Sequence, residues 1–406
     1  MSKSTKPRVA IIGAGPGGLT AGALLQASDY QVDIYEQAPT IVRLGAGIHL
    51  GPNCIKVLNR IGIGHKMVEY AVRPTAWVSR MWDTGEILAS QPLKDFSEEH
   101  YGAAYITIHR GDMHAMLVNT VAPGTIHFGK RLVDLEQDAS SVAMEFADGE
   151  KARADILIGA DGVHSRVREW MLGAEPPIYS GYIGHRVTFP SERLGDLQID
   201  DLAKWWAPDR HLIVYYLTHR RDEVYLVTGV MEEWSGDVTW TQSSQDELRS
   251  AFVGFHPTCQ RLIDLATGEV TKWAFFERPP QQSWINGRVV LLGDACHPMK
   301  PHMGQGAAMA IEDAAMLVRC LDHCHPDDFD QAFTLYYANR IDRVSEVQRV
   351  SRYNTWLRDP SDPTWVFGYD VFNDPLNEFG GSRQSEKARD GVAHCITRAE
   401  AAAGQT

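Results

Sequence analysis

The hydrophobic pattern at the start of the chain predicts a strand, a turn, a helix and a second strand. Residues 8–12 read Arg-Val-Ala-Ile-Ile, which is apolar on both faces, as buried strands of a parallel sheet usually are. A glycine-rich turn at 13–18 follows, then a helical segment at 19–27 and a second apolar strand at 30–35, which ends at Glu36. This order predicts one βαβ unit.

The pattern changes along the rest of the chain. Residues 75–105 show little helical periodicity, whereas 154–159 and 288–292 are again apolar enough for buried strands. Between 182 and 230, β-branched, aromatic and polar residues alternate, which predicts an antiparallel sheet with one covered face. A helix is expected at 306–321. We therefore expect an α/β nucleotide domain, assembled from separated segments, with a sheet domain inserted between them.

Composition narrows the class of partner. The chain has 406 residues, of which 44% are hydrophobic and 22% charged, as in ordinary soluble globular proteins with two or three domains. Its net charge of −13 argues against a nucleic-acid partner, because phosphate backbones are bound by clustered basic faces. The uncharged run at 9–28 contains a glycine turn and lacks a cleavage pattern, so we expect a cytoplasmic protein without a membrane segment.

No metal site is expected from the cysteines. Six cysteines are scattered along the chain, unlike a disulfide framework. Cys320, His323, Cys324 and His325 lie close together in sequence, but no second pair of ligands stands at a matching spacing. A local group of this kind beside a helix end is more often structural.

The glycine turn has the spacing of a dinucleotide-binding site. Gly13 would allow the tight turn, Gly15 the close approach of backbone to a pyrophosphate, and Gly18 the packing of helix on strand. The helix N-terminus would attract the phosphates, and Glu36 could accept hydrogen bonds from ribose hydroxyls. This motif alone leaves FAD and NAD open, so an NAD dehydrogenase is an alternative at this point.

Two further motifs follow predicted strands. One contains Asp161-Gly162 and Arg166, and the other contains Gly293-Asp294, followed by Gly304-Gln305-Gly306. With the glycine turn, these resemble the three fingerprints of the group A flavoprotein hydroxylases, whose prototype is para-hydroxybenzoate hydroxylase. In isolation, Asp161 would read as a helix cap and Arg166 as part of a solvated helix face. The resemblance implies bound FAD, with NADH or NADPH as a transient co-substrate.

The resemblance also assigns cofactor-binding residues. Asp294 sits at a strand-to-helix junction where it can bind ribityl hydroxyls, and the helix that Gly304 and Gly306 open could stabilise negative charge on the flavin. Arg110 matches the family's arginine near the FAD phosphates, and Arg43 is a weaker candidate. The expected FAD-binding set is Gly13, Gly15, Gly18, Glu36, Arg43, Arg110, Asp161, Asp294, Gly304 and Gly306.

A closer resemblance is to the branch of this family that acts in nicotinate breakdown and converts 6-hydroxynicotinate to 2,5-dihydroxypyridine with loss of carbon dioxide. The segments concerned are 43–49, 105–112, 204–206, 209–211, 214–216 and 297–303. The resemblance implies that His49, His211, Tyr215 and His302 line the substrate pocket.

The chemistry of the reaction suits such residues. A flavin C4a-hydroperoxide delivers an electrophilic oxygen, so the attacked ring carbon must be electron-rich. Deprotonating a ring hydroxyl supplies that density, which suits a histidine. His211 and Tyr215, four residues apart, would share one face of a strand, so we expect a relay with His211 as base. His302 and His49 could bind the carboxylate or ring oxygen.

One position departs from this branch. Leu202 stands where the family pattern has a cysteine near the substrate. Salicylate or another hydroxybenzoate or hydroxypyridine acid is therefore an alternative substrate, and a flavin dehydrogenase that does not activate oxygen is a further alternative. A homodimer is the expected assembly.

The fold expected is α/β, with a Rossmann-like FAD-binding domain, an inserted antiparallel-sheet substrate domain and a C-terminal helical segment. FAD-binding segments are expected at 1–74, 105–180 and 276–345, substrate-domain segments at 75–104 and 181–275, and a helical segment with a flexible tail at 346–406.

Overall fold

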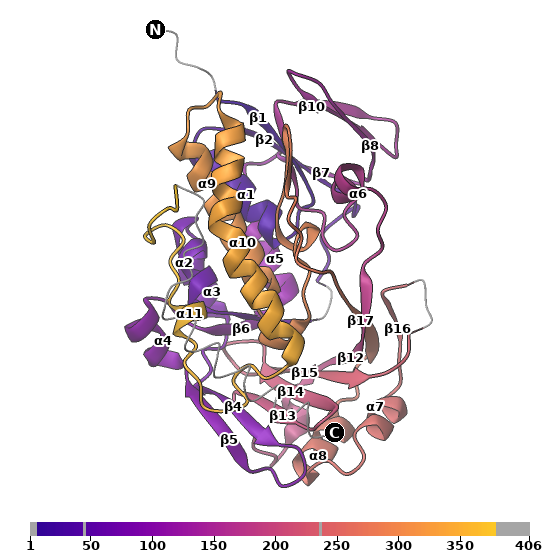
Figure 1. Cartoon of the computed structure of the whole chain (residues 1–406). Helices are drawn as coiled ribbons and strands as arrows, with labels where there is room; N and C mark the ends of the chain where they lie inside the picture. Colours follow the sequence, from indigo (N-terminus) through magenta and orange to yellow (C-terminus); the bar gives the residue numbers. More distant parts are fainter. Residues whose placement is uncertain (1–5, 44–45, 235–237, 379–406) are drawn as a thin grey trace.

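The computed structural model describes residues 6–43, 46–234 and 238–378. Figure 1 shows a nucleotide-type domain in the upper part of the view and a large sheet in the lower part, with α10 (Phe329–Tyr353) running from one to the other. The expected tail after 378 lies outside the described residues. The mixed α/β class with a Rossmann-like domain and a second sheet is confirmed.

The first sheet has the parallel core that the sequence predicts. Its strand order is β18-β19-β11-β1-β2-β7, and the four pairings from β19 to β7 are parallel, whereas β18 pairs with β19 antiparallel. The strands are β1 (Arg8–Ile12), β2 (Gln31–Glu36), β7 (Ile126–Phe128), β11 (Ile156–Gly159), β18 (Ile285–Asn286) and β19 (Val289–Leu291). Segments distant in sequence therefore assemble one sheet.

Helix α1 (Pro16–Ala27) begins one turn earlier than expected. Pro16 occupies the first turn, where its missing N–H costs nothing and its fixed φ favours the helix. Gly17 and Gly18 are therefore the first helical glycines and not part of a loop. Three helices pack side by side over the sheet, since α9 (Gly306–His323) contacts both α1 and α10.

The second sheet has eight strands in the order β16-β17-β12-β15-β14-β13-β4-β5. It is antiparallel except between β13 and β4, a parallel pair that the alternation pattern did not predict. The strands are β4 (Ala76–Met81), β5 (Ile87–Pro92), β12 (Ile178–Pro190), β13 (Leu202–Trp206), β14 (Arg210–Tyr216), β15 (Glu223–Met231), β16 (Trp240–Gln242) and β17 (Thr271–Glu277). Residues 75–105 thus supply two strands of this sheet.

The two faces of this sheet have different neighbours. Leu212 and Val214 point to one face, where they form a core with Leu248 of α7 (Gln245–Ala251) and Leu262 of α8 (Pro257–Leu265). Because side chains alternate along a strand, His211, Ile213 and Tyr215 point to the opposite face, towards the nucleotide domain. The predicted alternation therefore creates one packed face and one face available for a site.

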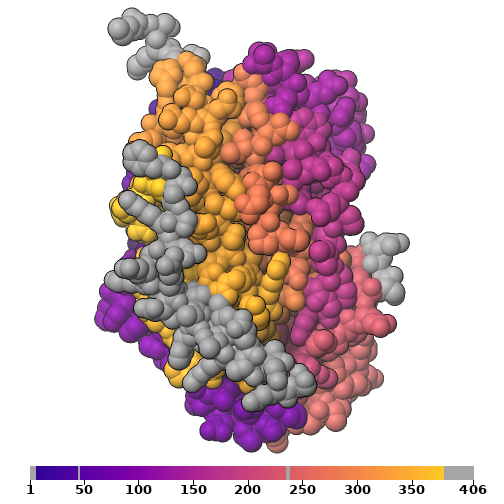
Figure 2. Space-filling view, viewed as in Figure 1, coloured from indigo at the N-terminus to yellow at the C-terminus, as the bar shows by residue number. Residues whose placement is uncertain are grey.

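The remaining elements connect these layers. They are α2 (Pro52–Arg60), α3 (Gly64–Tyr70), α4 (Lys94–Tyr101), α5 (Arg110–Val118), α6 (Arg166–Leu172), α11 (Thr364–Phe367), the pair β3 (Gly47–Leu50) and β6 (Ile106–His109), and the sheet β10 (Lys151–Ala154), β9 (Val142–Phe146) and β8 (Leu132–Gln137). In Figure 2 the orange segment that contains α9 and α10 extends along the molecule from its upper end. Helix α10 continues through residues 345 and 346 without a break, where the sequence analysis divides the chain.

Candidate functional site

The three motif glycines are each required for a different reason. Gly13 has φ +104°, and a Cβ there would lie 2.4 Å from the Ala160 carbonyl oxygen. A Cβ on Gly18 would lie 2.1 Å from the Gly13 carbonyl oxygen, so this glycine lets α1 approach β1. A Cβ on Gly15 would meet no described atom within 4 Å. The open side at Gly15 is therefore where a ligand can approach the backbone.

Glu36 is fixed beside this turn. Its two carboxylate oxygens accept hydrogen bonds from the backbone N–H groups of Ala14 and Ala38, each at 2.8 Å. The carboxylate stands at the end of β2, next to the glycine turn, as the sequence predicts. These bonds hold it in place for ribose hydroxyls.

Arg110 and Asp294 lie near enough to each other for each to influence the pKa of the other. Both side chains are accessible to solvent, yet both are crowded by protein: burial lowers the pKa of Arg110 and raises that of Asp294. Among the described residues, no group accepts a hydrogen bond from the Arg110 guanidinium. Gly304, with φ +66°, and Gly306 lie next to Asp294, whose Oδ1 would be 3.9 Å from a Cβ on Gly306. This region offers one cation, one carboxylate and open helix N–H groups.

Two of the expected FAD ligands are engaged in other contacts. Arg43 forms ion pairs of 2.8 Å with both Asp112 and Glu223, and its side chain is 47% exposed. Asp161 caps α6, because its Oδ2 accepts hydrogen bonds from the N–H groups of Arg166 and Val167. Their contacts with FAD stay predictions, whereas these structural contacts are direct.

The glycine turn, Glu36, Arg110 and Asp294 fit FAD by their own chemistry. The open glycine turn at the N-terminus of α1 suits a pyrophosphate, Glu36 suits a ribose, and Asp294 suits the hydroxyls of a ribityl chain. Arg110 adds a positive charge without a bound carboxylate among the described residues. No metal is needed for this fit.

A buried ionic network supports the Gly293-Asp294 turn. Asp313 Oδ2 accepts a 3.0 Å hydrogen bond from the Gly293 N–H and contacts His297, while Arg340 Nε donates to Asp313 Oδ1 at 2.7 Å. Arg340 also donates to Glu312 at 2.7 Å. Burial alone would raise the pKa of Asp313, but His297 and Arg340 lower it to about 2.

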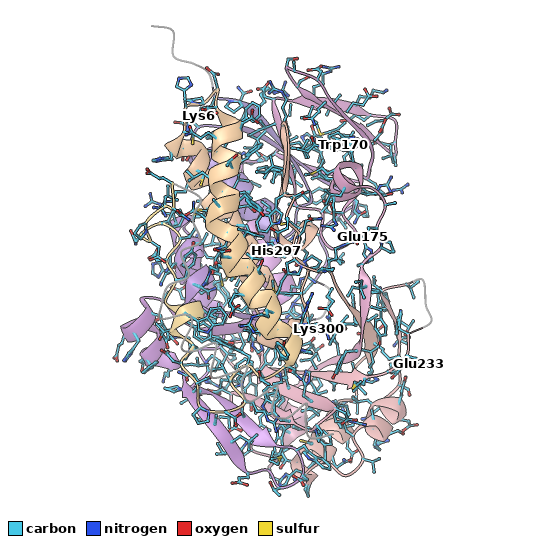
Figure 3. The ribbon with its side chains drawn as sticks, in the orientation of Figure 1. Lys6, Trp170, Glu175, Glu233, His297 and Lys300 are labelled. Carbon is cyan, nitrogen blue, oxygen red and sulfur yellow. The ribbon has the colours of Figure 1, made fainter. Side chains whose placement is uncertain are left out.

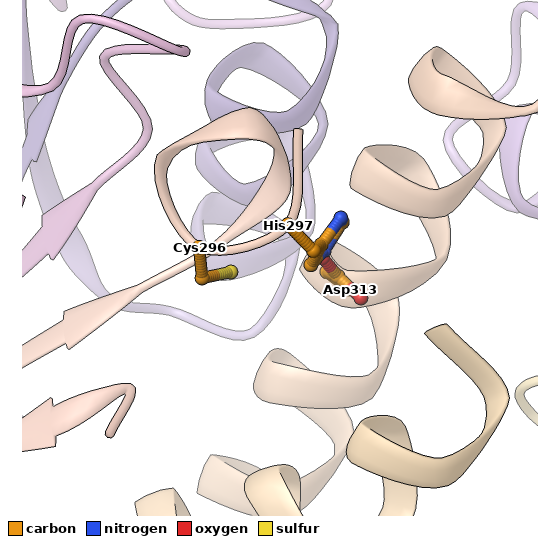
Figure 4. A group of neighbouring side chains, drawn as sticks. All are labelled: Cys296, His297 and Asp313. Atoms are coloured by element: carbon orange, nitrogen blue, oxygen red, sulfur yellow. The ribbon is translucent and has the colours of Figure 1, made fainter. Parts of the chain in front are cut away.

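This network contains a group with the donor types of a metal site. In the described part of the chain, only Cys296, His297 and Asp313 lie close enough together to share an ion, and Figure 4 shows His297 directed towards Asp313. Both Asp313 oxygens are already occupied by cationic or N–H donors, including Arg340. Burial, above all, raises the pKa of the Cys296 thiol. The group is therefore better suited to positioning the turn than to binding a cation.

The segment after this turn descends towards the large sheet. Figure 3 shows His297 nearer the nucleotide domain and Lys300 nearer the lower end of α10. His302 follows and is 2% exposed. Its Nδ1 lies 2.8 Å from the carbonyl oxygen of Ser351, in the last turn of α10. The loop thereby brings a histidine from the cofactor domain onto the open face of the sheet.

His302 meets His211 at one end of a pocket. The two imidazole rings are 5.5 Å apart and almost perpendicular. His211 Nδ1 lies 3.2 Å from Asn354 Nδ2, and Asn354 Oδ1 accepts a 2.7 Å hydrogen bond from Lys204 Nζ. Asn354 can reach them because it ends α10 in the left-handed conformation, with φ +50°, which asparagine tolerates. Lys204 and Asn354 complete this end of the pocket.

Tyr215 and His49 form the other end. Their rings are 4.4 Å apart and almost perpendicular, and His49 Nδ1 lies 3.1 Å from the Tyr105 hydroxyl. Gly47 is needed beside them, because a Cβ there would lie 2.6 Å from the Tyr215 hydroxyl. His49 also lies next to Gly304, whose added Cβ would be 3.7 Å from His49 Nδ1. This end is therefore adjacent to the proposed flavin site.

The structure separates His211 from Tyr215, so the expected relay between them is wrong. Four residues on a strand span about 13 Å, and the apolar side chain of Ile213 lies between the two on the same face. In the described part of the chain, no hydrogen bond or ring contact joins His211 to Tyr215. The four expected pocket residues form two pairs, His49 with Tyr215 and His211 with His302, and their role in substrate binding stays a prediction.

All three pocket histidines are held neutral. Burial, followed by the charge of Lys204, lowers the pKa of His49 to about 3 and lowers that of His211. Burial and Lys204 likewise lower the pKa of His302 to about 3, against the hydrogen bond to Ser351. Burial raises the pKa of Tyr215, so this phenol is a donor.

Four further residues, Lys204, Asn354, Gly47 and Gly229, contact or make room for the expected pocket residues and are not predicted from the sequence. Lys204 was noted only as part of a motif, and Asn354 carried no signal because its position depends on where α10 ends. Gly47 and Gly229 had a usable signal, since an isolated glycine in a strand often marks the close approach of another group. Leu202 is buried directly opposite Tyr215, so the departure noted in the sequence lies at the Tyr215 end.

Comparison with known proteins agrees with these features. A family model described as FAD binding domain matches residues 6–349. The 6-hydroxynicotinate 3-monooxygenase of Pseudomonas fluorescens is 53% identical over 378 residues, which is 92% of this chain and 98% of that protein. The enzyme of the same name from Bordetella bronchiseptica is 52% identical over 375 residues, with the same coverage of 92% and 98%.

A solved structure shows the same architecture. Klebsiella pneumoniae HpxO, complexed with FAD and uric acid, is 28% identical, with a TM-score of 0.76 over 88% of this chain and 90% of that one.

Among the described residues, no helix is long and apolar enough to cross a membrane.

Proposed function

The chain belongs to the family of FAD-binding flavoprotein aromatic hydroxylases, and from this premise we propose that its reaction is the decarboxylative 3-hydroxylation of 6-hydroxynicotinate. The products would be 2,5-dihydroxypyridine and carbon dioxide, with one NADH or NADPH oxidised and one O2 reduced, one oxygen atom entering the ring and the other leaving as water. Bound FAD would accept the electrons of NADH or NADPH and activate O2, from which the transferred oxygen atom comes. That the two relatives act on 6-hydroxynicotinate supports the choice of substrate.

The two-ended pocket is the observation that supports this substrate best. In 6-hydroxynicotinate the ring hydroxyl and the carboxylate lie at opposite positions of the ring. Two pairs of rings support this match: Tyr215 lies beside His49, and His211 lies beside His302, with Ile213 between His211 and Tyr215 on β14. Salicylate carries its two polar groups on adjacent carbons and would leave one end without a partner, which costs binding free energy.

We assign the ring hydroxyl to the Tyr215 end. The attacked carbon lies opposite the hydroxyl, so removing the hydroxyl proton raises electron density where oxygen is added. His49 is neutral in the ligand-free protein because burial lowers its pKa, so it can accept a hydrogen bond from the ring hydroxyl, whereas Tyr215, with its raised pKa, can donate one to the same oxygen. Tyr105 orients His49 through the 3.1 Å contact. His49 replaces His211 as the proposed base.

The cofactor residues would act together in this proposal. Gly13, Gly15 and Gly18 admit the pyrophosphate, Glu36 binds a ribose, and Asp294 binds the ribityl chain. Arg110, Gly304 and Gly306 provide positive potential beside the flavin, and Asp161 and Arg43 hold the surrounding segments in place.

A second substrate class is favoured by one residue. Leu202 gives the Tyr215 end an apolar wall where the family pattern has a cysteine. Another para-substituted hydroxy acid, such as 4-hydroxybenzoate, satisfies the same two ends.

A cytoplasmic location and a homodimeric assembly are further proposals, to be tested by cell fractionation and by sedimentation.

Oxygen uptake by the purified yellow protein tests the function. We expect NADH-dependent uptake with 6-hydroxynicotinate and little with salicylate, with 2,5-dihydroxypyridine as product. Coupled turnover of salicylate without turnover of 6-hydroxynicotinate would contradict the proposal. Turnover without oxygen consumption would identify a flavin dehydrogenase.

A further inference from the structure

Lys204 is buried beside His211, and burial lowers the pKa of its ammonium group well below the usual value. Its side chain is 0% exposed, and its ammonium lies 3.6 Å from the centre of the Trp206 ring. Its hydrogen-bond partner is the neutral amide of Asn354. Among the described residues, no carboxylate forms an ion pair with Lys204. Because an unpaired buried charge is costly, an anion bound beside Lys204 would stabilise its ammonium form, so we expect this residue to serve an anionic ligand.

The hydrogen bonds of Lys204 determine the orientation of Asn354. Lys204 Nζ donates to the amide oxygen of Asn354, so this oxygen faces Lys204. The Asn354 NH2 group then faces His211 Nδ1, at 3.2 Å. Because that NH2 group donates, His211 Nδ1 must accept, and the proton of the neutral imidazole resides on Nε2. His211 therefore presents an N–H donor to the pocket.

His302 lies at the same end, but its proton resides on Nδ1 and not on Nε2. Its Nδ1 donates to the Ser351 carbonyl oxygen, and its Nε2 is buried without a partner among the described residues. After burial, Lys204 is the next cause that lowers the pKa of His211 and of His302, so its amino group lies near both rings. An anion in the space between the rings would be adjacent to one N–H donor and to the amino group that it would keep protonated.

We propose that His211, Lys204 and Asn354 form the subsite for the substrate carboxylate, with Lys204 and Asn354 as the positioning residues that fix His211 as a hydrogen-bond donor. This inference rests on the proposed function, since it assigns one end of that substrate. The carboxylate is favoured over the ring oxygen because it is charged before the reaction begins and so compensates Lys204 on binding. The ring oxygen has its own partners, Tyr215 and His49, at the opposite end.

A comparison of two ligands tests the subsite. The dissociation constants of 6-hydroxynicotinate and its neutral carboxamide would be measured from the change in flavin absorbance of the FAD-loaded enzyme, without NADH. Lys204→Met should weaken binding of the acid at least about tenfold, and that of the amide less than about threefold. Asn354→Leu should show the same difference, and Lys151→Met, at a side chain that is 73% exposed, should show neither loss. Equal losses for both ligands would assign Lys204 a structural role and overturn the proposal.

The tautomer of His211 gives a test that needs no pocket variant to fold. In wild-type enzyme with 15N-labelled histidine, we expect long-range 1H–15N spectra to show His211 protonated at Nε2. Protonation at Nδ1 would overturn the proposal. If the wild type binds another aromatic acid and not 6-hydroxynicotinate, the proposed substrate is wrong, but the acid-to-amide comparison with that ligand still tests the subsite.

Discussion

Gly229 on β15 lies directly opposite His211 on β14, and a Cβ on Gly229 would lie 2.2 Å from His211 Cε1. The glycine is therefore required by the space that the imidazole fills, not by its backbone conformation. Gly229→Ala should displace the His211 ring and weaken substrate binding at least about tenfold, because the ring would lose its bond to Asn354. The FAD content, read from the absorbance spectrum, should stay close to that of the wild type.

A double-mutant cycle separates this effect from general strain. If the alanine acts through His211, adding Gly229→Ala to His211→Ala should change substrate affinity little, since the displaced ring is already absent. Additive losses would show that Gly229 acts on another part of the sheet.

Leu202 should determine how large a substituent the Tyr215 end accepts. It is fully buried opposite Tyr215 on the adjacent strand. Leu202→Ala should lower the free energy of unfolding by about 2–4 kcal/mol and leave a cavity. We expect kcat/KM to rise for ring substrates with an added methyl group beside the hydroxyl, relative to 6-hydroxynicotinate. An unchanged ratio across such a substrate series would place Leu202 outside the substrate contact.

Arg340 should be needed for the stability of the cofactor domain. It is fully buried and donates hydrogen bonds of 2.7 Å to both Glu312 and Asp313. Arg340→Met would leave two buried carboxylates without this partner, so the free energy of unfolding should fall by about 3–5 kcal/mol in urea titrations. Arg349→Met on the same helix, at a partly exposed pair, should cost less than about 1 kcal/mol. Similar losses for both variants would contradict the role of the network.

The buried histidines should make the protein less stable in mild acid. His49 and His302 have pKa values of about 3 in the folded protein, lowered first by burial, against 6.5 for an ordinary histidine. Below about pH 6.5 the unfolded chain binds protons that the folded protein excludes. The free energy of unfolding should therefore fall as the pH drops below 6.5, by about 1.4 kcal/mol per pH unit for each histidine.

Denaturant titrations between pH 7 and 5 would measure this slope. His302→Gln should make it shallower by the share of one histidine, whereas His325→Gln, at a side chain that is 67% exposed, should not. An unchanged slope in His302→Gln would show that His302 is protonated in the folded protein.

Local patterns were sufficient to predict the nucleotide domain. The glycine spacing, the strand before it and Glu36 after it are set within one stretch of chain, and the structure reproduces each. The start of α1 was misplaced because Pro16 was assigned to the turn, although proline favours a first helical position. The parallel pairing of β13 with β4 was not predictable from alternation, which records faces and not strand direction.

The contacts among the residues expected in the pocket were predicted only in part. The sequence predicts that His211 and Tyr215 lie together because they share one face of a strand, but the length of strand between them keeps them apart. The roles of Lys204 and Asn354 depend on α10 ending beside a strand about 150 positions earlier, which no local pattern encodes. Such long-range contacts decide which histidine can act as the base.

Release of the carboxyl carbon tests the proposed function most directly. With 6-hydroxynicotinate labelled by 13C at the carboxylate, the enzyme should release one labelled CO2 for each NADH oxidised and form 2,5-dihydroxypyridine. A hydroxylated product that retains the label, or no turnover of this acid alongside efficient turnover of salicylate, would contradict the proposed function.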